Sequence, residues 1–384
     1  MKKQVAIYGY GKSAKSVAEY ILDQFSKEIN IVGFYVLDLR ATELDNIDEF
    51  TVYNIEAIKE MYITGVVNSV IIPNLGKQVV NVLERHYELQ MSEILYVSAQ
   101  RLRRPINERY FIEINSEKPW LDGFEFHVAD HCNLNCKGCG HCANLFQKPS
   151  YPDIYEYEKD LKRLKQLYDG IGLIRLLGGE PLLNNQLDKF IKVTKLYFEE
   201  TELHIVTNGI LLTKMSESLI KIIKEEQVII DVSLYPPVEE RLPDFVVFLE
   251  KHRIEYNIMP VELFYKRFSV HGKYDKMQAF MHCGTATCHA LYKGKLSSCI
   301  VPFSVEQLNR RFGTEIDIDG WIDIYDENIT GWKINWKLQS PFELCTHCNP
   351  QKQLYPWTQR KYKDCVLQDW LLDEGSEDIY EMEV

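Results

Sequence analysis

Two series of alternating strand-like and helix-like segments constrain the fold of this chain most. In residues 1–97, apolar runs at 4–8 and 31–37 are typical of strands, and apolar residues recur at helical spacing over 13–25. A second series starts with an apolar strand at 124–128 and continues through at least five such units to 256–260. This alternation implies parallel sheets with helices packed on their faces. We therefore predict an α/β protein with two successive sheets.

The pattern divides the chain into five parts, each with its own character. We predict an N-terminal Rossmann-like parallel sheet, a linker with basic residues and prolines, a partial (β/α)6 TIM barrel, a small C-terminal β-hairpin and Cys-rich module, and an acidic tail with seven acids and no base. These parts cover residues 1–97, 98–122, 123–280, 281–368 and 369–384.

Composition excludes two classes of partner. The 44 Lys and Arg residues against 56 Asp and Glu give a net charge of −12, which does not suit a protein that binds nucleic-acid phosphates through a basic surface. No apolar run approaches the ~20 residues of a membrane helix. The first 25 residues lack an apolar signal core, so we expect a cytoplasmic protein.

The first strand leads into a G-x-G-x-x-A turn that contains Gly9 and Gly11. In a dinucleotide-binding fold such glycines let the backbone approach a pyrophosphate, and Asp38 lies where a ribose-binding acid would be. The same turn can equally be a tight strand-to-helix connection. The segment resembles the Rossmann-like domains fused to some bacterial polysaccharide-modifying enzymes, which implies a nucleotide or sugar-nucleotide ligand.

Ten cysteines, all after position 131, are the strongest chemical signal. In a reducing compartment clustered cysteines favour metal binding or catalysis over disulfides. Cys132, Cys136 and Cys139 form a C-x3-C-x2-C pattern directly after a predicted strand. Three thiolates from one loop can bind three irons of a 4Fe–4S cluster and leave the fourth iron open. Zinc is the alternative, but structural zinc prefers four closed ligands, usually in two pairs.

With two further motifs, this loop resembles the radical SAM superfamily over about residues 122–265. The motifs are Gly178-Gly179-Glu180-Pro181 after the second barrel strand and Thr207-Asn208-Gly209 after the third. The resemblance implies a 4Fe–4S cluster whose open iron binds S-adenosylmethionine. It also implies reductive cleavage to a 5′-deoxyadenosyl radical, fed by a low-potential electron donor such as flavodoxin or ferredoxin.

The resemblance also implies roles for residues at the strand ends. Gly178 and Gly179 would let the backbone approach the cofactor, and Glu180 would accept the methionine ammonium. Asn208 and Ser233 would contact the ribose or carboxylate, although Ser233 can equally be a satisfied strand-end hydroxyl. Many family members place an aromatic residue before the third cysteine, where this chain has Gly138, so the adenine contact stays open.

A second cysteine group follows the barrel and frames a predicted hairpin at 289–298, with Lys293-Gly294 as its turn. Four thiolates there could hold a second 4Fe–4S cluster or a zinc ion. The group resembles the twitch and SPASM modules, which show C-x9–15-G-x4-C followed by C-x2-C. That resemblance favours one auxiliary cluster of the shorter twitch form, with four ligands: Cys288, Cys299, Cys345 and Cys348.

The remaining candidates are catalytic. Cys142 and Cys283 are by default buried thiols, but either could donate a hydrogen atom to a substrate radical, and Cys365 could be an extra ligand. Asp231 and Tyr235 alternate with Ser233 and would share its face, as a candidate base and a substrate contact. We expect structural roles for three histidines near the loop: His127, His131 and His141.

These features predict a radical SAM oxidoreductase acting on a sugar, a sugar-nucleotide or a related polyol. An auxiliary cluster could accept the electron of a substrate radical, which favours dehydrogenation. Epimerisation of the sugar and modification of a ribosomally made peptide are the alternatives. An iron–sulfur scaffold without radical chemistry is a further one, against which Glu180 and the three loop cysteines argue.

Overall fold

The computed structural model describes residues 3–8, 18, 22, 26–27, 29–36, 46–47, 50–54, 65–68, 94–96, 118–286, 288–338 and 340–372. The chain divides into two compact units, Met1–Glu117 and Lys118–Val384. Gly9, Gly11, Asp38 and the tail from residue 373 lie outside the described residues, so their predicted roles stay predictions. Within those residues, no helix is long and apolar enough to cross a membrane.

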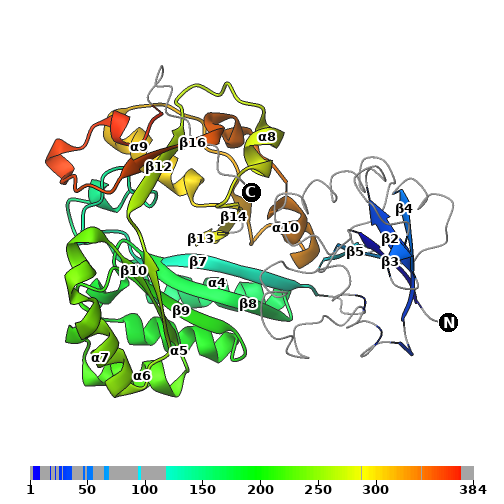
Figure 1. Cartoon of the computed structure of the whole chain (residues 1–384), viewed down its shortest axis with the longest axis horizontal. Coiled ribbons are helices and arrows are strands. Elements are labelled where there is room, and N and C mark those ends of the chain that lie inside the picture. The colour runs from blue at the N-terminus through cyan, green and yellow to red at the C-terminus, as the bar shows by residue number, and fades with distance from the viewer. Residues whose placement is uncertain are drawn as a thin grey trace. The chain divides into compact units, whose positions relative to one another are not determined.

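The first unit contains a six-stranded sheet (Figure 1). The five parallel strands are β1 (Lys3–Tyr8), β2 (Ile29–Val36), β4 (Phe50–Asn54), β5 (Gly65–Asn68) and β6 (Ile94–Tyr96). Their spatial order β4-β2-β1-β5-β6 is the order found in doubly wound nucleotide-binding folds. The edge strand β3 (Asn46–Ile47) pairs antiparallel with β4.

The second unit is built on five parallel strands in sequence order: β7 (Trp120–Ala129), β8 (Gly170–Gly178), β9 (Glu202–Thr207), β10 (Ile229–Leu234) and β11 (Tyr256–Pro260). They alternate with four helices: α4 (Ile154–Leu167), α5 (Leu187–Tyr197), α6 (Glu217–Glu225) and α7 (Leu242–His252). Figure 1 shows these helices together on one side of the sheet. The periodicity of the sequence predicted each of these elements.

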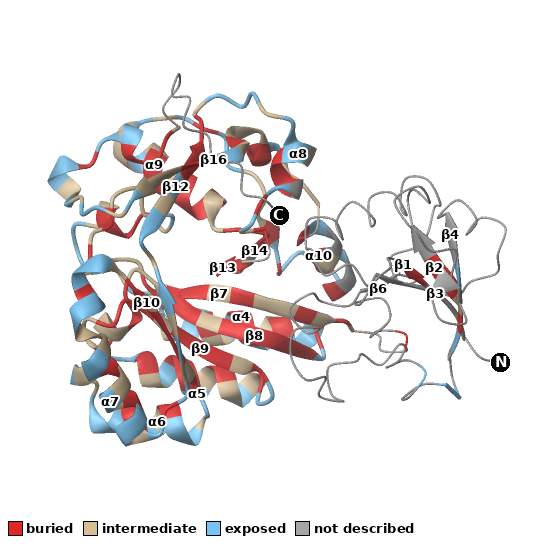
Figure 2. Ribbon diagram, in the orientation of Figure 1, coloured by how far each residue is buried: buried red, intermediate tan, exposed pale blue. Residues whose placement is uncertain are grey.

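The core of the second unit lies between the helices and one face of the sheet (Figure 2). Ile174, Leu176 and Ile205 point from the strands into it, and Leu161 meets them from α4. Because side chains alternate along a strand, the neighbouring positions lie on the other face of the sheet. That inner face carries charged and polar residues, which become important at the site.

The predicted sixth barrel unit is wrong for the described residues. β12 (Leu263–Phe268) pairs antiparallel with β16 (Cys348–Pro356) instead of continuing the parallel sheet. Only Val261 and Glu262 separate β11 from β12. A parallel neighbour needs a crossover of a dozen or more residues, and this connection is too short to form such a crossover.

The predicted hairpin at 289–298 is confirmed as β13 (Ala290–Tyr292) and β14 (Lys295–Ser297). Its turn residues Lys293 and Gly294 have φ values of 46° and 72°, as a two-residue hairpin of type I′ requires. β13 pairs parallel with β7, and β15 (Ile322–Asp323) adds to β14, so the hairpin extends the barrel sheet. The remaining helices of this region are α8 (Lys276–Met281), α9 (Val301–Phe312) and α10 (Gly331–Leu338).

Gly123 tests the close pairing of β7 with β8. A Cβ at this position would lie 2.2 Å from the carbonyl oxygen of Leu173 on the neighbouring strand. We expect Gly123→Ala to lower the free energy of unfolding of the second unit by about 1–3 kcal/mol, since the strands must move apart. Urea unfolding followed by tryptophan fluorescence measures this. Gly140→Ala is the control, because no atom lies within 4 Å of its Cβ position; equal stability of the two variants would contradict the strand contact.

Candidate functional site

Three predicted ligands lie in one loop after β7, residues 130–142, here called the cysteine loop. Each thiol receives N–H groups from its surroundings. The amide of Leu134 donates to Cys132 Sγ at 3.4 Å, and Trp357 Nε1 donates to Cys136 Sγ at 3.1 Å. Three backbone amides that follow Cys139 donate toward its sulfur. Such donors suit sulfur atoms that carry negative charge.

The thiols of the cysteine loop are hard to ionise without a cation. Burial raises the pKa of Cys132 to about 12, and burial also raises the pKa values of Cys136 and Cys139. Bound iron would supply the missing positive charge. Structural zinc prefers four closed ligands, whereas each cysteine of a 4Fe–4S cluster binds its own iron, so three thiols from one loop fit the cluster better.

The glycines after β8 allow the strand to contact the cysteine loop directly. A Cβ on Gly178 would lie 2.1 Å from the carbonyl oxygen of Ala129, and one on Gly179 would lie 2.0 Å from that of His131. Gly179 N donates to Ala129 O at 2.7 Å and Glu180 N to His131 O at 3.1 Å. The two glycines are therefore required for backbone packing of the loop, a reason separate from the predicted approach of a cofactor.

Glu180 is a fully buried carboxylate that joins the ends of two strands. Its Oε1 accepts hydrogen bonds from the Leu182 amide at 3.0 Å and from Thr207 Oγ1 at 2.7 Å, and its Oε2 accepts from the Asn208 amide at 2.9 Å. Burial raises the pKa of Glu180 to about 7 despite these donors. A cationic ligand group beside it would favour the ionised form.

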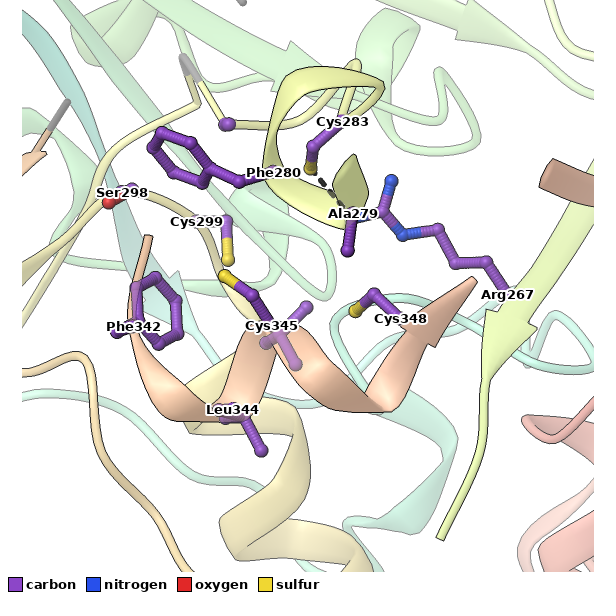
Figure 3. Close-up of a pocket in the computed structure, with 12 residues that line it drawn as sticks. Arg267, Ala279, Phe280, Cys283, Ser298, Cys299, Phe342, Leu344, Cys345 and Cys348 are labelled. Atoms are coloured by element: carbon purple, nitrogen blue, oxygen red, sulfur yellow. Dashed lines mark hydrogen bonds between the residues drawn. The ribbon is translucent and has the colours of Figure 1, made fainter. Parts of the chain in front are cut away.

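Four other cysteines line a cavity beside α8, together with Arg267 (Figure 3). They are Cys283, Cys299, Cys345 and Cys348. Arg267 is 7% exposed, and its Nη2 donates to Cys283 Sγ at 2.6 Å. Burial alone would raise the pKa of the Cys283 thiol, but the Arg267 guanidinium and the hydrogen bonds of Thr285 together outweigh it, and the net shift is downward.

The cavity differs from the predicted ligand set in one member. Cys283 lines it, while Cys288 lies near Glu125 and Arg175, and burial raises the pKa of Cys288 to about 12. The spacing of the sequence could have indicated that Cys283 lies in this group. Ten residues separate Cys283 from Gly294, which fits C-x9–15-G-x4-C, and only five separate Cys288 from Gly294. Cys283 was predicted as a candidate hydrogen-atom donor, but its position in the cavity suits a cluster ligand.

Cys142 and Cys365 lie in the same buried cluster as three of the cavity cysteines, but neither lines the cavity. Cys142 is fully buried, and its Sγ donates to the carbonyl oxygen of Ser304 on α9. Cys365 accepts a hydrogen bond from Asn144 Nδ2 at 3.3 Å, beside the cysteine loop. The roles considered for them, a hydrogen-atom donor and an extra ligand, stay predictions.

The three histidines near the loop make hydrogen bonds within the fold. His127 Nε2 lies 2.8 Å from His141 Nδ1, and His131 Nδ1 lies near the backbone of Ser150. Burial lowers the pKa of His141 to about 3, so its ring is neutral. These contacts agree with the structural roles expected for them.

Residues 127–258 match the family model described as the radical SAM superfamily. Among curated proteins, the chain is 33% identical over 109 residues to GTP 3′,8-cyclase of Aliarcobacter butzleri and 36% identical over 102 residues to that of Helicobacter pylori. Each match covers 26% of this chain and 31% of the relative, so the chain spans about a third of the length of the relatives it matches.

Three solved structures are similar at lower levels. Tagged anSMEcpe with bound AdoMet has 14% identity and a TM-score of 0.40, covering 60% of this chain and 83% of that one. BtrN in complex with AdoMet and 2-DOIA has 16% identity and a TM-score of 0.34, covering 60% and 94%. Streptococcus suis SuiB bound to S-adenosylmethionine has 16% identity and a TM-score of 0.25, covering 48% and 51%. These TM-scores are too low to define the fold.

Two residues predicted to contact a cofactor or substrate in the matched region lie at the cysteine loop. Asn208 Nδ2 donates to Asn133 Oδ1 at 2.8 Å and to Cys132 Sγ at 3.5 Å, so its side chain holds the loop. Burial raises the pKa of Tyr235, and the nearby loop cysteines raise it further. Ser233 is half-buried on β10, two residues before Tyr235.

Asp231 belongs to a polar row across the inner face of the sheet, and this row was not predicted as a unit. Its members are Glu125, Arg175, His204, Asp231 and Asn257, one from each strand from β7 to β11. Asp231 Oδ2 lies 2.6 Å from His204 Nδ1, and Oδ1 accepts from Asn257 Nδ2 at 2.8 Å. His204 Nε2 lies 2.5 Å from Glu202. Burial opposes ionisation of Asp231, yet these bonds lower its pKa, so it is a carboxylate at neutral pH.

Glu180 predicts a pH dependence of cofactor binding. Only the ionised carboxylate attracts an ammonium group, and the pKa of Glu180 is about 7. The affinity of the reconstituted protein for S-adenosylmethionine should therefore be full above about pH 7 and fall toward tenfold per pH unit below it. Calorimetry between about pH 6 and 8 measures this.

A matched pair of variants separates this effect from a general response to pH. Glu180→Gln should weaken binding and remove the slope, whereas Glu217→Gln, at an exposed position on α6, should keep it. A slope that survives in Glu180→Gln would show that another group controls binding.

Proposed function

We propose that this chain is a radical SAM oxidoreductase that carries an auxiliary iron–sulfur cluster and dehydrogenates a polar, sugar-type substrate. The observation that carries the proposal is the pair of cysteine groups: three thiols on the cysteine loop beside Glu180, one buried and two half-buried, and four buried thiols around the Arg267 cavity. The first group is suited to radical generation. The second is suited to accepting an electron.

The cysteine loop would hold the first 4Fe–4S cluster through Cys132, Cys136 and Cys139. Glu180 would orient S-adenosylmethionine by accepting hydrogen bonds from its ammonium group. When bound, the cluster and S-adenosylmethionine supply a radical that removes hydrogen from the substrate. Gly178 and Gly179 keep the strand end against the loop, so Glu180 lies next to the cysteines.

The cavity would hold the auxiliary cluster through Cys283, Cys299, Cys345 and Cys348. All four thiols are buried, and Arg267 lies close to two of them, Cys283 and Cys348. A buried cation offsets part of the negative charge that four thiolates bring. An acceptor of this kind allows the loss of a second electron from the substrate, which distinguishes dehydrogenation from simple hydrogen abstraction.

The polar row supports a hydroxylated substrate in the barrel. A carboxylate and an imidazole on the inner face can accept hydrogen bonds from hydroxyl groups. Asp231 remains the candidate base, and its partner His204 leads to a second carboxylate, Glu202, along which the proton of a substrate hydroxyl could pass. Analogy of the first unit to polysaccharide-modifying enzymes also favours a carbohydrate.

Epimerisation is the second candidate, because Cys288 lies beside the polar row. Its thiol, with a pKa raised by burial to about 12, is neutral and lies near Glu125. A neutral thiol can return a hydrogen atom to a substrate radical. The thiyl radical that remains would then need one electron from a low-potential donor such as flavodoxin or ferredoxin and one proton from solvent.

Iron content tests the two cysteine groups. Protein reconstituted without oxygen should hold about eight irons, as two 4Fe–4S clusters. Cys283→Ala should reduce this to about four and leave cleavage of S-adenosylmethionine intact, because only the cavity loses a ligand. Cys288→Ala is the matched control and should keep about eight. The reverse result would restore Cys288 as the ligand.

Replacing Cys132, Cys136 and Cys139 together should remove the other cluster and abolish cleavage of S-adenosylmethionine. A triple variant that still cleaves it would refute the proposed function.

Solvent deuterium distinguishes the two reactions. In heavy water with a panel of sugars and nucleotide sugars, dehydrogenation gives a ketone without solvent deuterium at the abstracted carbon. We expect this product, two mass units lighter than the substrate, and we expect Cys288→Ser to keep the activity. A product of unchanged hydrogen count that carries one solvent deuterium, lost in Cys288→Ser, would instead favour epimerisation.

A further inference from the structure

A segment far along the chain lies against the cysteine loop. Residues 355–371, here called the clasp, run from the end of β16 through two short 3-10 helices. The amide of Lys137 donates to Thr358 O at 2.8 Å, and the amide of Arg360 donates to Asn135 O at 2.7 Å. Cys136 and Gln359 form an antiparallel bridge between them. More than two hundred residues of sequence separate these partners, so the contact is tertiary.

Gly138 makes this close approach possible. Its φ is +60°, and a Cβ there would lie 2.3 Å from Tyr355 Oη and 2.4 Å from the carbonyl oxygen of Asp369. Both atoms belong to the clasp. The position where many family members carry an aromatic side chain is therefore filled here by residues of the clasp.

Two tryptophans of the clasp donate hydrogen bonds to the loop, but to different kinds of atom. Trp357 Nε1 donates to the sulfur of Cys136 at 3.1 Å. Trp370 Nε1 donates to the carbonyl oxygen of Cys139 at 2.8 Å. Both bonds fasten the clasp to the loop. Trp370 also lies within hydrogen-bonding reach of the Cys142 thiol, but only the bond of Trp357 reaches the sulfur of a predicted cluster ligand.

We propose that Trp357 is a positioning residue that sets the reduction potential of the cluster held by the cysteine loop. The inference rests on the proposed function, since it requires that Cys136 binds iron. A hydrogen bond to a ligand sulfur stabilises the reduced cluster, which carries more negative charge, and so raises the reduction potential. Cys136 is only 7% exposed, so the indole N–H is not readily replaced by water.

The ring of Trp357 is held in place by other aromatic side chains. Its centroid lies 6.3 Å from that of Tyr235, which in turn lies 6.1 Å from Phe264. Phe264 lies 6.2 Å from Tyr355 of the clasp. This aromatic group orients the indole and fixes the direction of its N–H toward Cys136.

The test is a redox titration of the cysteine-loop cluster followed by electron paramagnetic resonance. It uses the full chain with Cys345→Ala and Cys348→Ala, so that the auxiliary cluster does not contribute to the signal. Trp357→Phe keeps an aromatic ring but removes the N–H, and the midpoint potential should become more negative. Trp370→Phe is the matched control, since it removes a bond to the same loop without touching the sulfur of a proposed ligand, and its potential should stay at the parent value.

Each outcome is decisive. An unchanged potential in Trp357→Phe, or an equal shift in both variants, would overturn the role of the Cys136 bond in favour of general loop packing. If Trp357→Phe does not assemble the cluster, benzothienylalanine at position 357 preserves the indole shape without its N–H and should give the same negative shift. A parent protein that assembles no cluster on the cysteine loop would refute the proposed function itself, and this inference with it.

Discussion

The geometry of the site depends on how an irregular loop is held in place. The cysteine loop has little regular secondary structure of its own, so its buried backbone groups need partners from outside. The end of β8 supplies them on one side, through Gly179 and Glu180, and the clasp supplies them on the other, through Thr358 and Arg360. Positions 178, 179 and 138 have to be glycine because a Cβ at any of them would collide with a neighbouring oxygen. The cysteines are thus positioned by two separate layers of structure.

The sequence predicted those parts of the molecule that are local and periodic. The strands and helices of the second unit follow from alternating and helical spacing, and the hairpin follows from Lys293-Gly294. The sixth unit of the predicted barrel had no strand assigned to it in the sequence, and the strand that follows β11 pairs with β16. Cys288 was the predicted ligand, whereas Cys283 lines the cavity, and both lie near the hairpin. The distance to Gly294 distinguishes them, and the structure agrees with that distance.

The clasp and the polar row could not be predicted in the same way. The clasp contacts the loop mainly through backbone atoms, which leave no pattern of side chains in the sequence. The polar row takes one residue from each of five strands, so no single segment looks unusual. Asp231 could be identified as facing the barrel, but its hydrogen bonds to His204 and Asn257 depend on the register between strands. Tertiary contacts of this kind become visible only when the strands are aligned.

The two cysteine groups meet the same electrostatic problem in different ways. Thiolates in a buried site need compensation for the water they lose. On the cysteine loop, the described donors are amide and indole N–H groups, which are dipoles without net charge. In the cavity, Arg267 brings a full positive charge within hydrogen-bonding distance of Cys283. The guanidinium offsets the charge of the fourth thiolate, which the cysteine loop lacks, and so makes a cluster in the cavity easier to reduce than four thiolates alone would. In the proposed enzyme, this favours the passage of electrons from the substrate to the cavity.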